Sequence, residues 1–282
     1  MNFLAVDLGG TRLKAALMAH GESVPSDPFS IEHGGDWRGG LHTAVDHFGE
    51  VGEIAACVPG LVDNGRVVAL PGKLPGLVDA DLQAELGMPV LLTNDAVAYA
   101  IGEAVHGAGR SHQRVVVVTI GTGLGVGVVE DGEPLGHGPL GGGILSGQVL
   151  ISDPDAGPSD TSGRRGTFEA LCRASSLLAE IPAARDLPEA YELLRAGDEG
   201  ALVGFAAYRE WLTRGLSMLA LAHAPSVIVI GGGAAQPGLL DGVQEALAPR
   251  LWQGQGVEVR PGELGDSAAL AGLGALWRQA DE

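Results

Sequence analysis

Cysteine, aromatic residues and lysine are all scarce in this chain. Its 282 residues include two cysteines, and aromatic side chains make up 4% of the total. Cys57 and Cys172 are too few for a disulfide framework and form no C-x-x-C pair, so a cytoplasmic protein is expected. No apolar run approaches the roughly 18 to 20 residues that a membrane span requires, so no membrane partner is expected.

Positive charge is scarce as well. The chain has 17 lysine and arginine residues against 35 acidic residues, and its formal net charge is −18 at pH 7. A surface of this sign repels nucleic acids and anionic lipids, so nucleic acid is excluded as a partner and a small-molecule ligand is favoured. Lysine occurs only at Lys14 and Lys73. Lys14 follows a glycine turn and is interpreted as a phosphate contact, with a solvated strand end as the alternative.

Glycine and small apolar residues are abundant. There are 46 glycines and 45% hydrophobic residues, a composition typical of an α/β protein with many tight turns. Periodicity predicts strands at residues 3–8, 12–18, 54–58, 90–93, 115–120, 124–129 and 226–230, and helices at 96–106, 167–180, 188–196, 200–223, 239–250 and 267–279. Residues 132–166 lack periodicity and predict long loops of functional importance.

Two glycine turns, each between apolar strand-like runs, carry the strongest functional signal. The first turn covers residues 7–11, D-L-G-G-T, and the second turn covers residues 121–123, G-T-G. Glycine lacks a Cβ and accepts positive φ, so backbone N–H groups can converge on an anion. The residues predicted to bind nucleotide phosphates are Gly9, Gly10, Thr11 and Lys14 on one side and Gly121, Thr122 and Gly123 on the other. Asp7 would hold Mg²⁺ through a water molecule. An ordinary hairpin is the alternative.

Two further stretches follow predicted strands. The third turn, at Gly231, Gly232 and Gly233, predicts a bare backbone surface for adenosine, with a plain strand-to-helix turn as the alternative. Asn94 and Asp95 end a strand and open a helix, where an open α/β sheet places its catalytic side chains. Asp95 is predicted to accept the proton of an attacking hydroxyl group while Asn94 positions the acceptor. A helix cap is the alternative reading.

Taken in order, these motifs resemble the ROK family of sugar kinases and sugar-responsive repressors. The set comprises D-x-G-G-T-x-x-K from Asp7, V-P-G-L-V-D from Val58, N-D at Asn94, G-T-G-x-G-x-G from Gly121 and G-G-G from Gly231. The resemblance covers nearly the whole chain. It implies a two-lobed α/β fold of the actin-like ATPase (ribonuclease H-like) type, with ATP and Mg²⁺ in a cleft between the lobes. It also implies a hexose or amino-sugar acceptor beside Asp95 as catalytic base, and a homodimer. Gly60 is interpreted as substrate-binding.

The expected domain organisation follows from the positions of these motifs. An N-terminal lobe at residues 1–108 would carry the first turn and Asp95. A C-terminal lobe at residues 109–266 would carry the second and third turns. The linker between the lobes is expected near residues 107–113, and a C-terminal helix at residues 267–282 would pack back on the N-terminal lobe.

The chain departs from the family pattern in two segments. Family kinases carry G-E-I-G-H, whose glutamate and histidine bind the sugar, whereas residues 143–147 read G-I-L-S-G here. Gln148 and Ser146 are the nearest polar replacements, and His137 lies in the preceding loop. The family zinc motif C-x-C-G-x-x-G-C-x-E is matched by residues 160–169, where all three cysteines are replaced. Without soft ligands we predict no structural zinc. Glu169 is retained and is predicted to accept a hydrogen bond from a sugar hydroxyl, with stabilisation of the first helical turn by its charge as the alternative.

These observations favour an ATP-dependent kinase for a hexose or amino sugar. The loss of two polar sugar-binding groups leaves a second hypothesis open, a sugar- or nucleotide-binding protein with little or no kinase activity. A sugar-responsive repressor is disfavoured, because such members carry an upstream DNA-binding domain and the first turn here begins at residue 7.

Overall fold

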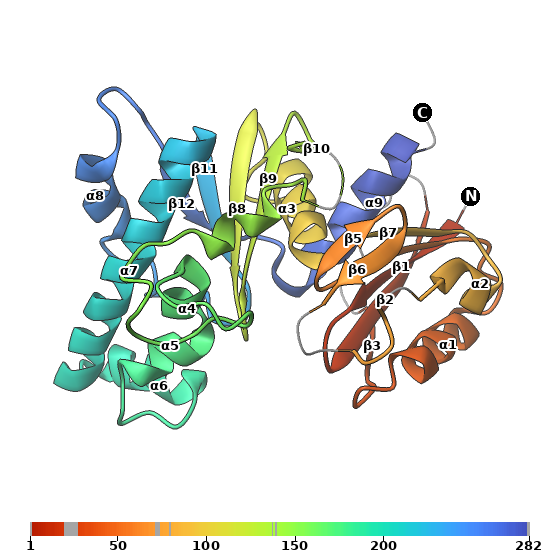
Figure 1. Ribbon diagram of the computed structural model, residues 1–282, viewed down its shortest axis with the longest axis horizontal. Helices are drawn as coiled ribbons and strands as arrows, with labels where there is room; N and C mark the ends of the chain where they lie inside the picture. The colour runs from red at the N-terminus through yellow and green to blue at the C-terminus, as the bar shows by residue number, and fades with distance from the viewer. Residues whose placement is uncertain are drawn as a thin grey trace.

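The protein has two lobes, each built on a five-stranded sheet (Figure 1). The structure, a computed structural model, describes residues 2–19, 28–70, 74–78, 80–136, 138 and 140–280. His137 therefore lies outside the described residues. The α/β class and the two-lobed architecture predicted from the sequence are confirmed.

The N-terminal sheet has the strand order β3-β2-β1-β4-β7. Its strands are β1 (Asn2–Leu8), β2 (Arg12–Ala19), β3 (Phe29–Glu32), β4 (Ile54–Val58) and β7 (Val90–Asn94). β1 pairs antiparallel with β2 and parallel with β4, so Asp7 lies between Lys14 on one neighbour and Cys57 on the other. Helices α1 (Trp37–Phe48) and α2 (Leu82–Leu86) cover one face, and the hairpin of β5 (Leu61–Asp63) and β6 (Arg66–Ala69) follows β4.

The C-terminal sheet has the strand order β10-β9-β8-β11-β12. Its strands are β8 (Arg114–Ile120), β9 (Leu124–Glu130), β10 (Glu133–Pro134), β11 (Val227–Gly231) and β12 (Glu258–Pro261). Its outer face packs against helices α4 (Phe168–Cys172), α5 (Ala174–Ala179), α6 (Leu187–Ala196), α7 (Glu199–His223) and α8 (Val243–Leu247). The neighbouring strands β8 and β11 are rich in valine because both of their faces are buried.

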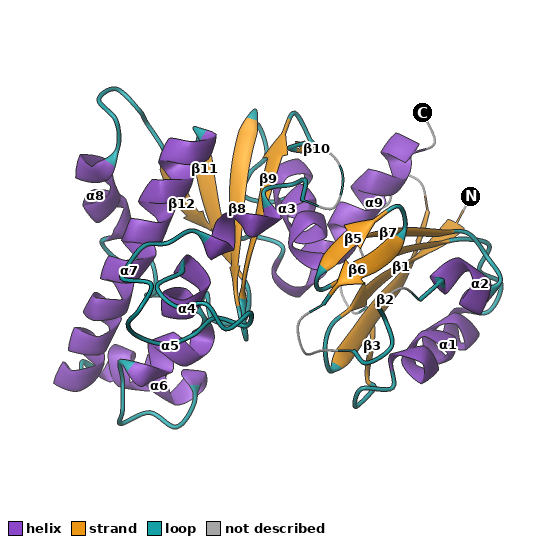
Figure 2. Cartoon of the chain, in the orientation of Figure 1, coloured by secondary structure: helices purple, strands orange, loops and turns teal. Residues whose placement is uncertain are grey.

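Two helices, α3 (Asp95–Val105) and α9 (Ala268–Ala280), lie between the sheets (Figure 2). α3 packs its apolar side chains on the C-terminal sheet, and α9 packs on the N-terminal sheet, where Trp277 stacks on Phe3 at 5.0 Å between ring centroids. The two helix backbones touch each other. A Cβ added to Gly272 would lie 1.7 Å from the Ala98 carbonyl oxygen, and one added to Gly102 would lie 2.0 Å from that of Ala268.

Most predicted elements are present, with two corrections to helices. The helix expected at 167–180 is two helices, because Arg173 adopts an extended conformation between α4 and α5. The helix expected at 239–250 is reduced to α8 and a 3-10 turn (Ala248–Arg250), since Gly242 takes the left-handed conformation just before α8. Within the described part of residues 132–166, the only regular elements are β10 and a 3-10 turn (Ile144–Gln148), so this segment is mainly loop.

Both cysteines are buried, and neither forms a disulfide. Across the described residues, none of the helices combines the length and the apolar character that spanning a bilayer would require.

Candidate active site

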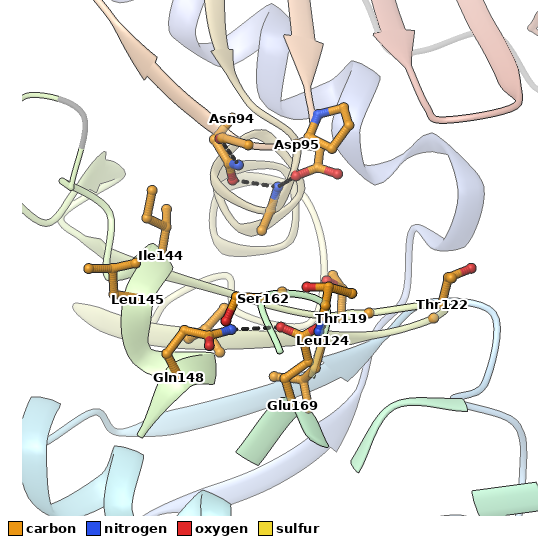
Figure 3. Close-up of a pocket in the computed structure, with 18 of the residues that line it drawn as sticks. Asn94, Asp95, Thr119, Thr122, Leu124, Ile144, Leu145, Gln148, Ser162 and Glu169 are labelled. Carbon is orange, nitrogen blue, oxygen red and sulfur yellow. Dashed lines mark hydrogen bonds between the residues drawn. The ribbon is translucent and has the colours of Figure 1, made fainter. Parts of the chain in front are cut away.

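A cavity of about 570 Å³ lies between the lobes and brings several predicted site residues together. The N-terminal lobe and the start of α3 contribute one wall, and the C-terminal lobe contributes the other (Figure 3). The predicted residues that line it are Gly60, Asn94, Asp95, Gly121, Thr122, Gly123, Glu169 and Gly232. Its remaining lining includes apolar side chains of Leu61, Leu70, Leu124, Ile144 and Leu145.

Asn94 and Asp95 stand at the junction of β7 and α3. Asn94 caps the helix, since its Oδ1 accepts hydrogen bonds from the backbone N–H groups of Ala96 at 2.9 Å and Val97 at 3.1 Å. Its Nδ2 donates to the Gly60 carbonyl at 2.7 Å. Asp95 follows in the first turn of α3, where the positive end of the helix dipole favours a carboxylate. The cap therefore fixes the place from which Asp95 faces the cavity.

Gly60 can only be glycine at its position. Its φ is +98°, and a Cβ would lie 2.3 Å from the carbonyl oxygen of Ala69 on β6. This close approach folds the β5–β6 hairpin back over the end of β4 and presents the Gly60 carbonyl to Asn94. The hairpin thereby contributes Leu61 to the cavity wall.

The second turn joins β8 to β9 and lines the cavity. Gly121 N–H donates to the Gly123 carbonyl at 2.9 Å, and the Gly121 carbonyl accepts from Ala174 N–H at 2.9 Å, so the turn is held on both sides. The glycines that follow serve packing. A Cβ on Gly125 would lie 2.8 Å from the Ala96 Cβ, and one on Gly127 would lie 2.3 Å from the Ala100 Cβ. They allow α3 to approach the sheet.

The first turn stands apart from this cavity. Asp7, Gly9, Gly10, Thr11 and Lys14 are all described, and none of them lines it. Gly9 N–H donates to the Arg12 carbonyl at 3.0 Å, which closes the turn. Lys14 Nζ forms an ion pair with Asp266 Oδ2 at 3.0 Å. The phosphate contacts predicted for this turn stay predictions.

His33, which the sequence analysis did not select, holds the first turn from the loop before α1. Its Nε2 lies 2.9 Å from the Gly9 carbonyl oxygen, and its backbone N–H donates to the Thr11 carbonyl at 3.0 Å. Gly35 N–H donates to Nδ1 at 3.1 Å. Since Nδ1 accepts, the ring proton belongs on Nε2, which donates to Gly9. No local sequence signal links His33 to a turn more than twenty positions away.

Asp7, at the end of β1, has a strongly shifted pKa. Burial, followed by the negative charge of Asp95, raises its pKa from 3.8 to about 6, although Lys14 acts in the opposite direction. Its Oδ1 accepts a weak hydrogen bond from the Cys57 thiol at 3.6 Å. Oxygen donors and a repulsion between two carboxylates suit Mg²⁺, which binds carboxylates together with water and phosphate oxygens.

The three glycines of the third turn differ in what surrounds them. A Cβ on Gly231 would lie 2.4 Å from the Tyr99 hydroxyl, and one on Gly232 would lie 2.5 Å from the Ile120 carbonyl oxygen. Nothing lies within 4 Å of the equivalent point on Gly233. Only Gly232 lines the cavity, so Gly231 is explained by the packing of Tyr99 from α3.

Glu169 lies across the cavity from Asp95 (Figure 3) and accepts hydrogen bonds from two donors. Gln148 Nε2 donates to its Oε2 at 2.6 Å, and Thr161 N–H donates to its Oε1 at 3.2 Å. Gln148 is therefore a cavity residue, as the sequence suggested. Ser146 is not, because its hydroxyl bonds to His223 Nε2 at 2.9 Å and it does not line the cavity.

The loop that matches the family zinc motif does not suit zinc. The three cysteine positions of that motif are occupied here by Asp160, Ser162 and Thr167. The hydroxyl groups of Ser162 and Thr167 both donate hydrogen bonds to the Asp160 carboxylate. Structural zinc is bound by thiolates and imidazoles, and this donor set has neither. In the described part of the chain, no group of three or more histidine, cysteine, aspartate or glutamate side chains could hold a metal ion.

Comparisons with known proteins find relatives that span most of the chain. The model of the ROK family matches residues 3–280. A glucokinase from Thermotoga maritima is 30% identical over 272 residues, which cover 84% of this chain and 84% of the glucokinase. A xylose repressor from Bacillus spizizenii is 27% identical over 239 residues, but the match covers 81% of this chain and only 61% of the repressor.

A solved structure agrees with the fold described above. The crystal structure of a ROK hexokinase from Thermus thermophilus has a TM-score of 0.81 and 28% identity, with 100% of both chains covered. The actin-like ATPase fold implied by the sequence motifs is thereby confirmed.

Proposed function

Because the chain belongs to the ROK family, we propose that it transfers the γ-phosphoryl group of ATP to a hydroxyl group of a hexose or an amino sugar. The observation that carries this proposal is the shared cavity. Asp95 enters it from one wall, and the second turn and Glu169 enter it from the other. A carboxylate facing a glycine turn across a cavity of this size suits a small acceptor beside a phosphate group.

On the acceptor side, each residue has a distinct task. Asp95 accepts the proton of the attacking hydroxyl group. The Asn94 side chain is fixed by its bonds to the Gly60 carbonyl and to the start of α3, and from this position at the cavity wall it orients the acceptor. Glu169 accepts hydrogen bonds from another hydroxyl group of the sugar. Correct positioning of this kind supplies about 7 to 11 kcal/mol of the barrier reduction in well-oriented reactions.

On the nucleotide side, backbone N–H groups bind the phosphates. The second turn contributes Gly121, Thr122 and Gly123, the first turn contributes Gly9, Gly10 and Thr11, and Lys14 adds a positive charge. Gly232 and Gly233 offer bare backbone to the adenosine. Because the first turn lies outside the cavity, we propose that the lobes close around the nucleotide and exclude water. Asp7 would hold Mg²⁺, which supplies charge neutralisation to the phosphates when it is bound.

Substitution of the proposed base tests this function. Asp95→Asn should lower kcat by about 10² to 10⁴, because the acceptor hydroxyl loses its proton acceptor. The Asn94 cap stays in place, so the free energy of unfolding should change by less than about 1 kcal/mol. ADP release is measured with ATP and Mg²⁺ over a panel of hexoses, N-acetylhexosamines and pentoses. Asp131→Asn, in the turn after β9, is the matched control.

A binding protein without efficient catalysis is the second candidate. It is favoured by the apolar side chains of Ile144 and Leu145 on the cavity wall, in the segment where family kinases carry polar sugar-binding groups. The same assay separates the two. ADP release that Asp95→Asn abolishes supports the kinase. If no acceptor in the panel causes ADP release while calorimetry detects sugar binding, the binding protein is supported and the kinase is rejected.

A further inference from the structure

The loop that carries Thr161 and Ser162 into the cavity is folded around one buried carboxylate. Asp160 is 5% exposed. Its Oδ1 accepts hydrogen bonds from Ser162 N–H at 2.9 Å, Ser162 Oγ at 2.8 Å and Arg164 N–H at 2.9 Å. Its Oδ2 accepts from the Thr167 hydroxyl at 2.9 Å. Four donors converge on one side chain, so its hydrogen-bonding capacity is well used.

This arrangement reaches Glu169 by two routes. The Thr167 hydroxyl donates to Asp160 and also accepts from Ala170 N–H at 3.1 Å, so it caps α4, the helix that carries Glu169. Asp160 also fixes the loop around Thr161 through its bonds to Ser162 and Arg164, and Thr161 N–H donates to Glu169 Oε1 at 3.2 Å. Asp160 does not line the cavity, yet the cap of α4 and the loop that carries Thr161 both depend on it, whereas the bond from Gln148 to Glu169 does not.

We propose that Asp160 is a positioning residue for the acceptor site, which holds Glu169 in its binding geometry by hydrogen bonds in place of a metal ion. The proposal rests on the function proposed above. Asp160 and Thr167 are buried, and a polar network whose buried members are satisfied is rigid and specifies one conformation. Burial alone would raise the pKa of Asp160, but the hydrogen bonds from Ser162, Thr167 and Arg164 outweigh it and hold the pKa below its usual value.

Asp160→Asn tests the proposal, because one acceptor oxygen becomes an amide donor that opposes the Thr167 hydroxyl or the N–H groups of the loop. We expect the KM for the sugar to rise at least about tenfold while the KM for ATP stays within about twofold. Thr167→Val, a buried change outside the cavity, should act in the same direction, and Thr167→Ser should restore the wild-type KM. Asp186→Asn, the same chemical change at the N-cap of α6, is the matched control and should leave both KM values unchanged.

Amide hydrogen exchange provides a readout that does not depend on turnover. In the wild type, the amides of Thr161 and Ala170 should be protected, and dialysis against a zinc chelator should not change this. In Asp160→Asn both amides should exchange faster, whereas in Glu169→Gln the Ala170 amide should keep its protection. Unchanged exchange in Asp160→Asn, or loss of protection in the wild type after chelation, would overturn the proposal.

The two proposals fail in different ways. If Glu169→Gln raises the KM for the sugar and Asp160→Asn does not, Asp160 is only structural and this inference is wrong. If the wild type phosphorylates no acceptor, the kinase proposal is wrong, and the exchange experiment still decides whether Asp160 orders the Glu169 loop.

Discussion

At the scale of single residues, Asp7 combines a predicted role in metal binding with a cost to stability. Its pKa rises to about 6 in the folded protein from 3.8, so the folded state holds the proton more tightly than the unfolded chain does. The stability that this proton provides is present below about pH 4 and is lost as the pH rises to about 6. Above that range, the buried carboxylate destabilises the fold by at most about 3 kcal/mol.

Asp7→Asn should therefore make the protein more stable and less active. The gain in the free energy of unfolding, relative to wild type, should grow between about pH 4 and pH 6.5 and then stay constant. Urea unfolding at several pH values, without nucleotide or Mg²⁺, measures it. Asp46→Asn, at an exposed position of α1, is the control and should show no such growth. A variant that is less stable than wild type at pH 7.5 would contradict this account.

At the scale of elements, the link between His33 and the first turn leads to a second prediction. His33→Ala removes the bond to the Gly9 carbonyl, while the backbone bond to Thr11 remains. Losing one hydrogen bond of about 0.5 to 1.5 kcal/mol should loosen the turn and raise the KM for ATP by roughly two- to tenfold. The KM for the sugar should not change, since His33 does not line the cavity.

Steady-state kinetics with each substrate varied in turn checks this prediction. His42→Ala, at an exposed position of α1, is the matched control. If His33→Ala raised the KM for the sugar as well as the KM for ATP, the substitution would disturb the whole site, and a specific effect on the first turn would be refuted.

The elements that sequence reasoning found are those whose signal is local. Apolar runs predicted the central strands, because their residues are buried on both faces. The helix α1 was missed since Gly39 and Gly40 lie in its first turn, where intrinsic propensity opposes a helix. Tertiary packing explains them in part, because Gly40 is buried and a Cβ there would lie 3.1 Å from the His33 Cβ.

The candidate site shows the same limit. Asn94, Asp95 and the second turn could be located because strand ends and glycine turns are visible in the sequence. The support from His33 and from Asp160 could not, since each depends on a loop conformation that no short pattern encodes. In the structure Gly125 and Gly127 both pack against α3, and Gly125 also lines the cavity.

At the scale of the whole molecule, one buried side chain ties together the connection from α3 to β8 and the connection from β12 to α9. Glu103, near the end of α3, is fully buried. It accepts from Ala108 N–H at 2.9 Å in the connection before β8, and from Glu263 N–H at 3.1 Å and Leu264 N–H at 2.9 Å in the connection from β12 to α9. The two connections are far apart in sequence, and the Glu103 carboxylate holds them in one place.

Glu103→Gln should consequently weaken both connections at once. In the variant, an NH₂ group replaces one of the two oxygens that accept from backbone N–H groups. A buried donor is then left without an acceptor, which should lower the free energy of unfolding by about 1 to 3 kcal/mol. Amide exchange should accelerate in residues 106–110 and 262–266 together. Glu245→Gln, exposed in the first turn of α8, should alter neither region. If only one of the two segments exchanges faster in Glu103→Gln, the carboxylate does not couple the connections, and their common position is due to the contact of α3 with α9 alone.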